Sequence, residues 1–443
     1  MKIQISDHFN YNKLLRFTVP TIVMMMFSAA YSVIDDGFFV ANFVGKEAFV
    51  ALNLMAPVIT VMGAVGFMLG TGGNAVVSKA LGEGKKDKAN QHFTLITLFT
   101  IAISAVITAF GLAVLKPACI AMGAEGAVLE DCLTYGYLIF PFTAVFLLQG
   151  IFQSFLITAG QPKLSMIITI TSGISNIVFD TLLIVLLKWG LVGAVWATLS
   201  GSIFGTLIPA GYFLFAKDRN LKFVKTPIEF RVLLRTCSNG SSELVTNLSI
   251  GLVSMLYNYQ LMRIAGNDGV AAFGAIMYIA YVFVSAFMGY SMGVAPLVGY
   301  SYGAQNHAEL KNIFHKSIVI LCITGLILFA LSELAAVPFS MIFVSSDEEL
   351  LQMTVRGTRI YSLIYLVSGI NIFGTGFFTA LDNGAVSAAL ALIRTMVLEV
   401  AAVFLLPLIW GIDGIWASAF VSDLLMLGIT IGTFVKMRPR YGY

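Results

Sequence analysis

Long apolar runs alternate with short polar segments along the whole chain. Runs long enough to cross a bilayer, which takes about 20 residues, occur twelve times. They are continuous and lack the apolar–polar alternation of barrel strands, so they predict helices. The sequence therefore predicts an all-α integral membrane protein with twelve transmembrane helices, at 14–43, 48–79, 91–115, 132–158, 163–187, 191–216, 233–264, 269–300, 314–338, 352–380, 385–409 and 413–435.

One polar segment divides these spans into two sets of six. The interruption from Lys217 to Arg235 is the longest in the chain, contains Pro227 and falls near the midpoint. It predicts an N-lobe at 1–216, a cytoplasmic linker at 217–232 and a C-lobe at 233–443. Within the first span, Pro20 removes a backbone donor and predicts a helix kink.

The two halves repeat each other at a constant offset of 221 positions. An offset kept from the end of span one to the start of span six is hard to obtain by chance. Because each half has six spans, both enter the membrane in the same orientation, which predicts a pseudo-two-fold axis along the membrane normal. Such lobes leave a cleft that opens to one side at a time, as in secondary transporters. The matches are Gly45 with Gly266, Ala51 with Ala272, Gly72 with Gly293, Gly82 with Gly303, Thr158-Ala159 with Thr379-Ala380, and Trp189-Gly190 and Gly193 with Trp410-Gly411 and Gly414.

Composition agrees with a chain surrounded by lipid. Of its 443 residues 58% are hydrophobic and only 11% are charged, with a mean hydropathy of +0.90. Soluble domains carry about 25% charged residues. The net charge of +3 gives no indication of a nucleic-acid partner.

The basic residues are distributed unequally between the two sides. The side that holds both termini collects 19 Lys and Arg residues. The opposite side collects six: Lys46, Lys116, Lys188, Arg263, Arg356 and Arg359. This bias predicts that both termini are cytoplasmic.

Acidic and amide side chains inside the spans of the first half are the candidate ion site. Asn176 and Asp180 are four residues apart in span five, so a helix places them on one face. An acid in hydrocarbon is costly unless it faces a cavity or a partner, so it is read as a proton or ion site by default; a structural hydrogen bond is the alternative. We expect Asp35 of span one to join them, with Asp36 either a further coupling acid or a surface residue.

The second half differs from the first in its charges. Glu243 lies just inside span seven, where it is placed to attract a cation or cap a helix start. Arg394 and Glu399 are five apart in span eleven, which is poor spacing for an intrahelical ion pair, so we expect them to pair with other spans. Together with Gln153 of span four, Glu243 and Arg394 are the candidate residues of the substrate cleft.

The sequence contains few motifs that would indicate an enzyme. The histidines and cysteines show no metal or redox spacing. The segment 70–74 is rich in glycine but lacks the Gly-Lys-Ser/Thr of a phosphate loop, and close helix packing explains its glycines better. We therefore expect no enzyme activity, no cofactor and no metal site. The residues concerned are His8, His92, His307, His315, Cys119, Cys132, Cys237 and Cys322.

Several segments together resemble the MATE (multidrug and toxic compound extrusion) family, bacterial drug-efflux branch, over nearly the whole length. The matching residues are Pro20, Tyr31-Ser32-Val33-Ile34-Asp35, Phe43-Val44-Gly45, Asn74-Ala75-Val76-Val77-Ser78-Lys79-Ala80-Leu81-Gly82-Glu83-Gly84, Asn176-Ile177-Val178-Phe179-Asp180, Gly240-Ser241-Ser242-Glu243 and Gly293-Val294-Ala295-Pro296-Leu297-Val298-Gly299-Tyr300-Ser301-Tyr302-Gly303-Ala304.

The resemblance implies an exporter of bulky, amphipathic, often cationic compounds in the bacterial inner membrane, driven by inward flow of H⁺ or Na⁺. It places Asp35, Asn176 and Asp180 in the family's N-lobe coupling cluster. Span ten has no acid in its apolar part, which favours coupling in the N-lobe over a sodium site in the C-lobe. One chain supplies both lobes, so we expect a monomer to function. The alternative is a flippase or exporter of a lipid-linked or metabolite substrate on the same scaffold.

Overall fold

The structure is a computed structural model that describes residues 3–216, 220–344 and 347–443. The side chains of residues 33–37 also lie outside the described part. Within these limits the described residues form helices joined by short turns, and no strand occurs among them.

The first half contains the six predicted spans. Pro20 lies inside α1, which continues through it as one helix, so the predicted kink stays a prediction. The elements are α1 (Tyr11–Phe43), α2 (Lys46–Gly82), α3 (Lys86–Ala121), α4 (Gly126–Ile139) continued by η1 (Phe140–Phe142) and α5 (Thr143–Thr158), α6 (Pro162–Asp180) continued by η2 (Thr181–Leu186), and α7 (Gly190–Phe215).

The second half repeats this order with more breaks. Its elements are α8 (Phe230–Gly303), α9 (His307–Leu334), α10 (Ala336–Phe343), α11 (Glu348–Ser362), α12 (Tyr365–Ala380), α13 (Gly384–Leu392) continued by η3 (Ile393–Leu398), α14 (Glu399–Leu405) and α15 (Pro407–Trp410), and α16 (Ile412–Tyr441).

The number of membrane crossings agrees with the predicted twelve. Ten helices of the described residues are long and apolar enough to span, and α11 with α12 forms one further span bent by 51°. The 74-residue α8 contains two crossings, because Gly266 has a non-helical backbone (φ 61°, ψ −147°) that divides it into two arms. Gly266 lies between the predicted spans 233–264 and 269–300.

The turns show that the repeat is structural as well as sequential. Gly190 and Gly411, which are 221 positions apart, both have a positive φ (59° and 57°) at the start of the last span of their half. Gly45 and Gly266, at the same offset, also both have a positive φ. Glycine lacks a Cβ and adopts a positive φ without steric cost. Gly190 and Gly411 share nearly the same φ, whereas Gly45 (φ 142°) and Gly266 (φ 61°) share only its sign.

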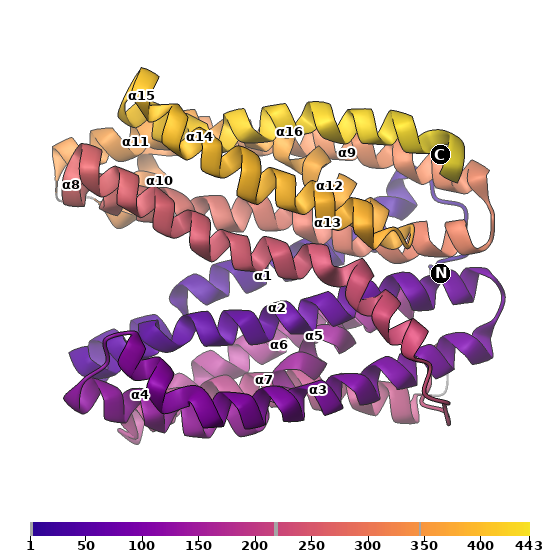
Figure 1. Cartoon of the computed structure of the whole chain (residues 1–443), viewed down its shortest axis with the longest axis horizontal. Coiled ribbons are helices and arrows are strands. Elements are labelled where there is room, and N and C mark those ends of the chain that lie inside the picture. Colours follow the sequence, from indigo (N-terminus) through magenta and orange to yellow (C-terminus); the bar gives the residue numbers. More distant parts are fainter. Residues whose placement is uncertain (1–2, 217–219, 345–346) are drawn as a thin grey trace.

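The helices form two lobes, α1–α7 and α8–α16, which lie mainly in the lower and upper halves of Figure 1; the start of α8 extends down over the lower half. Both chain ends and the segment between α7 and α8 lie at the same end of the molecule, which we call the terminal end; the opposite end is the distal end (Figure 1). The lobes share one apolar core at the terminal end, where N-lobe residues such as Phe9 and Phe17 join C-lobe residues such as Phe314 and Phe377.

The distal half of the N-lobe packs differently. Its buried apolar residues, among them Met55, Cys132, Tyr135 and Leu199, form a separate cluster, which among the described residues contains none from the C-lobe. The lobes are therefore joined by apolar packing at the terminal end, and the distal part of the N-lobe has a core of its own.

Glycines allow α2 and α8 to meet closely where the lobes join. A Cβ on Gly82 would lie 2.1 Å from the carbonyl oxygen of Tyr300, and a Cβ on Gly303 would lie 2.2 Å from that of Lys79. Gly82 and Lys79 correspond to Gly303 and Tyr300 at the offset of 221, so each lobe packs on the other through equivalent residues. This reciprocal contact is what a two-fold axis between the lobes requires.

Candidate functional site

A cavity of about 170 Å³ lies between the lobes. Helices α1 and α2 of the N-lobe and α8, α12, α13 and η3 of the C-lobe all contribute to its wall. Most of the lining is apolar or weakly polar, including Met25, Phe67, Tyr281, Met288 and Met292. Flexible methionines and aromatic faces suit flat apolar or cationic molecules of varied shape.

Glu243 and Arg394 are the charged residues among those that line this cavity. Glu243 comes from the first arm of α8, which packs on α2 so closely that a Cβ on Gly240 would lie 1.8 Å from the carbonyl oxygen of Met68. Gln153 is not among the described lining residues; it lies on α5, where its Nε2 donates to Thr169 Oγ1 at 2.9 Å. Its amide thus joins two helices of the N-lobe.

Arg394 is held by an acid from another span, as its spacing from Glu399 predicted. Its Nε and Nη2 donate to Oδ1 and Oδ2 of Asp423 on α16, at 2.6 and 2.9 Å. The two side chains are 17% and 3% exposed. This bidentate geometry is the strong form of an ion pair, and it neutralises most of the positive charge that Arg394 brings to the cavity wall.

Further polar groups surround this ion pair in the C-lobe. Glu399 interacts electrostatically with both Arg394 and Asp423 and faces the hydroxyl of Tyr257. Asn371 of α12 donates to the backbone carbonyl of Asp423 at 2.8 Å. The cluster thus contains two carboxyl groups and one guanidinium beside the cavity, and the guanidinium is paired with Asp423.

The predicted coupling residues of the N-lobe are only partly described. Asn176 and Asp180 lie on α6 and are 1% and 0% exposed, so the spacing of four does place them on one buried face. Asn176 Nδ2 lies 3.5 Å from Thr198 Oγ1 on α7. The side chains of Asp35 and Asp36 lie outside the described residues, so their expected meeting with Asp180 stays a prediction.

A π-helical segment interrupts the fifth span of each lobe. Asp180 is the last residue before η2, and Arg394 is the second residue of η3. Such segments are rare and often occur at functional sites, because the widened turn redirects the neighbouring side chains. The structure thus gives both buried charged positions the same local backbone feature.

Asp382 connects the lobes at the terminal end. Its side chain is 1% exposed, and Lys79 of α2 lies 2.9 Å from its Oδ2. From its own lobe it receives Arg235 and the amide of Asn239, whose Nδ2 lies 2.6 Å from Oδ1. A buried carboxylate needs such donors around it, and of the three only Lys79 comes from the other lobe, so that contact depends on the lobes being together.

A second connection runs from the N-terminal segment to the C-lobe. The amide of Phe9 donates to Glu309 Oε1 at 3.0 Å, and His8 Nδ1 lies 2.6 Å from Glu309 Oε2. From the next two turns of α9, Asn312 and Lys316 donate to the carbonyl oxygen of Phe9 at 2.9 and 3.0 Å. The segment before α1 is thereby fixed across the lobe boundary.

Two important acids escaped the interpretation of the sequence. Asp423 lies within an apolar run, and the reasoning applied to Asp180 would have found it too. Asp382 follows α12 in a turn and carries no such signal, because only the approach of Lys79 from the other lobe makes it notable. Within the described residues, no group of three or more His, Cys, Asp or Glu side chains is arranged to hold a metal ion.

Comparison with known sequences matches the model of the MatE family twice, to residues 20–182 and to residues 244–405. The two matches cover most of the chain and fall on its two halves. The chain belongs to the MatE family. It is therefore a multi-pass membrane transporter and not an enzyme.

Relatives and solved structures extend this result over nearly the full length. The multidrug export protein MepA of Staphylococcus saprophyticus is 23% identical over 423 residues, which is 94% of this chain and 91% of that protein. A crystal structure of a MATE in complex with MaL6 superposes with a TM-score of 0.91 at 20% identity, covering 98% of this chain and 97% of the other. An outward-facing multidrug resistance MATE family transporter gives the same TM-score and identity over 98% and 96%. The twelve-helix, two-lobe architecture is thus that of MATE transporters.

Proposed function

We propose that this chain exports amphipathic, cationic drug-like compounds in exchange for H⁺ or Na⁺, by alternating access and without any cofactor besides the coupling ion. The observation that carries the proposal is the cavity between the lobes, where Glu243 lies among methionine and aromatic side chains. A single carboxylate in an apolar, polarisable wall favours a hydrophobic cation. The name of the MepA relatives, multidrug export protein, supports this substrate class.

The alternative substrate, a lipid-linked or phosphorylated metabolite, would need a basic cleft. The basic residue among the described cavity lining is Arg394, and Asp423 binds it in a bidentate pair. Glu399 also interacts with that pair, so the described lining offers a phosphate no unpaired basic group. The electrostatics of the cleft therefore favour a cation.

Coupling is proposed for the N-lobe acids. Asp180 is fully buried beside Asn176, next to a π-helical segment. Two carboxylates close together in a low dielectric do not ionise together easily, so Asp35 and Asp180 would exchange one cation as the lobes move. Since one chain contains both lobes, the proposed working unit is a monomer.

The proposed setting is the bacterial inner membrane with both termini in the cytoplasm. The excess of basic residues on the terminal side supports this orientation. The terminal end, where Lys79 and Asp382 join the lobes, is then the cytoplasmic end. The lobes meet there in this structure, so the structure corresponds to a state that is closed toward the cytoplasm.

Uptake of a fluorescent cationic dye by everted membrane vesicles tests the proposal. Vesicles with the wild-type chain should accumulate dye. The proton and sodium gradients are collapsed in separate samples, and loss of uptake in one of them identifies the coupling ion. Asp180→Asn should lose uptake, whereas Asp268→Asn, which alters an exposed acid, should retain it. Dye uptake by Asp180→Asn at the wild-type rate would refute the coupling role, and absence of uptake by the folded wild-type protein would refute the transport proposal.

A further inference from the structure

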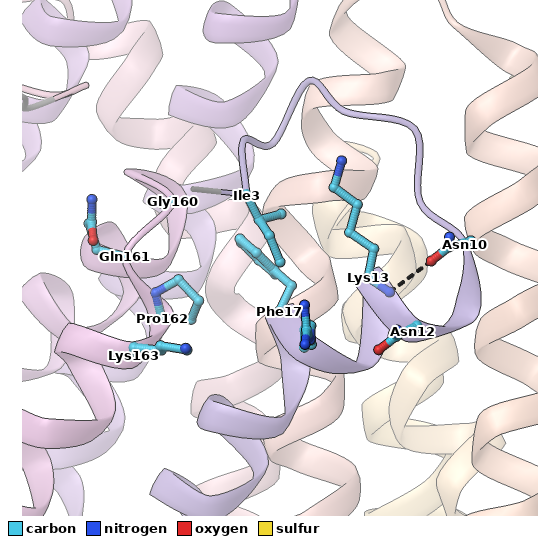
Figure 2. Close-up of a pocket in the computed structure, with 10 residues that line it drawn as sticks. Ile3, Asn10, Asn12, Lys13, Phe17, Gly160, Gln161, Pro162 and Lys163 are labelled. Atoms are coloured by element: carbon cyan, nitrogen blue, oxygen red, sulfur yellow. Dashed lines mark hydrogen bonds between the residues drawn. The ribbon is translucent and has the colours of Figure 1, made fainter. Parts of the chain in front are cut away.

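A second cavity lies away from the transport pathway, at the terminal end of the N-lobe. It measures about 660 Å³ and is formed by the N-terminal segment, the start of α1 and the turn into α6. Figure 2 shows Lys163 extending from the start of α6 toward α1, with Ile3 and Phe17 across from it and Lys13 above. Its volume falls within the range of about 300–1,000 Å³ that is usual for small-molecule sites.

Three cationic side chains line this cavity: Lys13, Arg16 and Lys163. Lys13 is paired with Asp7, at 2.7 Å, and the Asn10 side chain caps the helix beside it. Within the described residues, neither Arg16 nor Lys163 has an acidic partner within 4.0 Å, and both are exposed. Among the described residues the lining of this cavity therefore carries a net positive charge, which favours an anion.

The surface next to these cations is apolar and faces lipid. On α1, Leu15 and Val19 are 37% and 44% exposed beside Arg16. On α6, Ile167 is 54% exposed one turn deeper than Lys163. Both helices begin at the terminal end, so Val19 and Ile167 lie about one turn further into the membrane than Arg16 and Lys163, whereas Leu15 lies beside Arg16 at the rim.

We propose that this cavity binds the headgroup of an anionic phospholipid, with its phosphate between Arg16 and Lys163 and its acyl chains along Val19 and Ile167. Basic pockets between transmembrane helices on the cytoplasmic side are suited to such headgroups. A soluble phosphate compound shares the headgroup chemistry but would leave the apolar stripe uncovered, which is why the lipid is favoured. The cavity includes Ile3 and Asn10 of the segment that also binds Glu309, so the lipid contacts the connection between the lobes.

Native mass spectrometry of the purified full-length protein in detergent, titrated with lipid, tests this assignment. Phosphatidylglycerol should bind more tightly than phosphatidylcholine with the same chains. Each basic residue near an anionic membrane surface contributes about fivefold in affinity, so Arg16→Gln/Lys163→Gln should weaken phosphatidylglycerol binding roughly 25-fold and remove the preference over phosphatidylcholine. The matched control is Lys225→Gln/Arg231→Gln, which removes two exposed basic residues elsewhere at the terminal end and should leave both affinities unchanged.

Three outcomes would overturn the assignment. The first is equal binding of the two lipids by the wild-type protein, and the second is an undiminished preference for phosphatidylglycerol in the Arg16→Gln/Lys163→Gln variant. The third is binding of glycerol phosphate as tight as that of phosphatidylglycerol, because the ligand would then be a soluble anion. Lipid binding is measured without transport, so this test stands whether or not the dye-uptake experiment succeeds.

Discussion

The ion pair between Lys79 and Asp382 is the connection between the lobes that a single substitution tests best. Lys79→Met removes the ammonium group but keeps a long apolar side chain. Asp382 retains Arg235 and Asn239 from its own lobe, so the buried carboxylate is not left without partners. Only the contact across the lobe boundary is lost, and the effect should fall on the conformational equilibrium more than on folding.

The size of the effect follows from the geometry. Lys79 Nζ lies 2.9 Å from Asp382 Oδ2, and the two side chains are 22% and 1% exposed. A hydrogen bond to a charged group contributes about 1.5–3 kcal/mol net. Because this bond exists only while the lobes meet at the terminal end, its loss should shift the equilibrium toward the state open at that end by roughly 10- to 150-fold.

Distances between spin labels on the two lobes measure this shift. The labels are attached at Lys88→Cys in the N-lobe and at Lys436→Cys in the C-lobe, two exposed positions at the terminal end. The four native cysteines are replaced by serine, so that only these two positions are labelled. The distance distribution of Lys79→Met should gain a longer component.

The matched control is Lys85→Met. Lys85 is also basic and near the end of α2, but it pairs with Glu83 of the same lobe at 2.7 Å and is 55% exposed. If Lys79→Met and Lys85→Met give the same distance distribution as the parent, the interlobe pair does not hold the terminal end closed and the reasoning fails.

Two further substitutions test the packing and the buried charges. Gly303→Ala would place a Cβ against the backbone of Lys79, so it should separate the lobes at the terminal end and lower the melting temperature in detergent. The control Gly211→Ala, whose new Cβ has no heavy atom within 4 Å, should leave the melting temperature unchanged. Equal melting temperatures of the two variants would contradict the close contact. Arg394→Met should destabilise the C-lobe by about 3–5 kcal/mol, measured by chemical unfolding in micelles, because Asp423 loses its partner in a buried site. Adding Asp423→Leu should recover much of the lost stability. A double variant no more stable than Arg394→Met alone would refute this account.

The local sequence was enough to predict most of the fold. Apolar runs of spanning length predicted twelve helices, because the bilayer requires each span to satisfy its own backbone hydrogen bonds. The offset of 221 predicted the duplicated lobes, and the positive φ of Gly190 and Gly411 shows that equivalent glycines make equivalent turns. The pairing of Arg394 with another span also followed from spacing, because in an α-helix three or four residues, and not five, separate the partners of an ion pair.

The partners of the charged residues depended on the tertiary structure. Asp382 lies 303 residues from Lys79, and Glu309 lies 300 from Phe9, so no local pattern connects them. The π-helical segments that follow Asp180 and contain Arg394 could not be predicted from the hydrophobic pattern either, since they depend on how each span packs. The hydrophobicity of each local segment determines whether it enters the membrane. A contact between the lobes forms only when two folded surfaces meet, and this contact changes as the transporter opens.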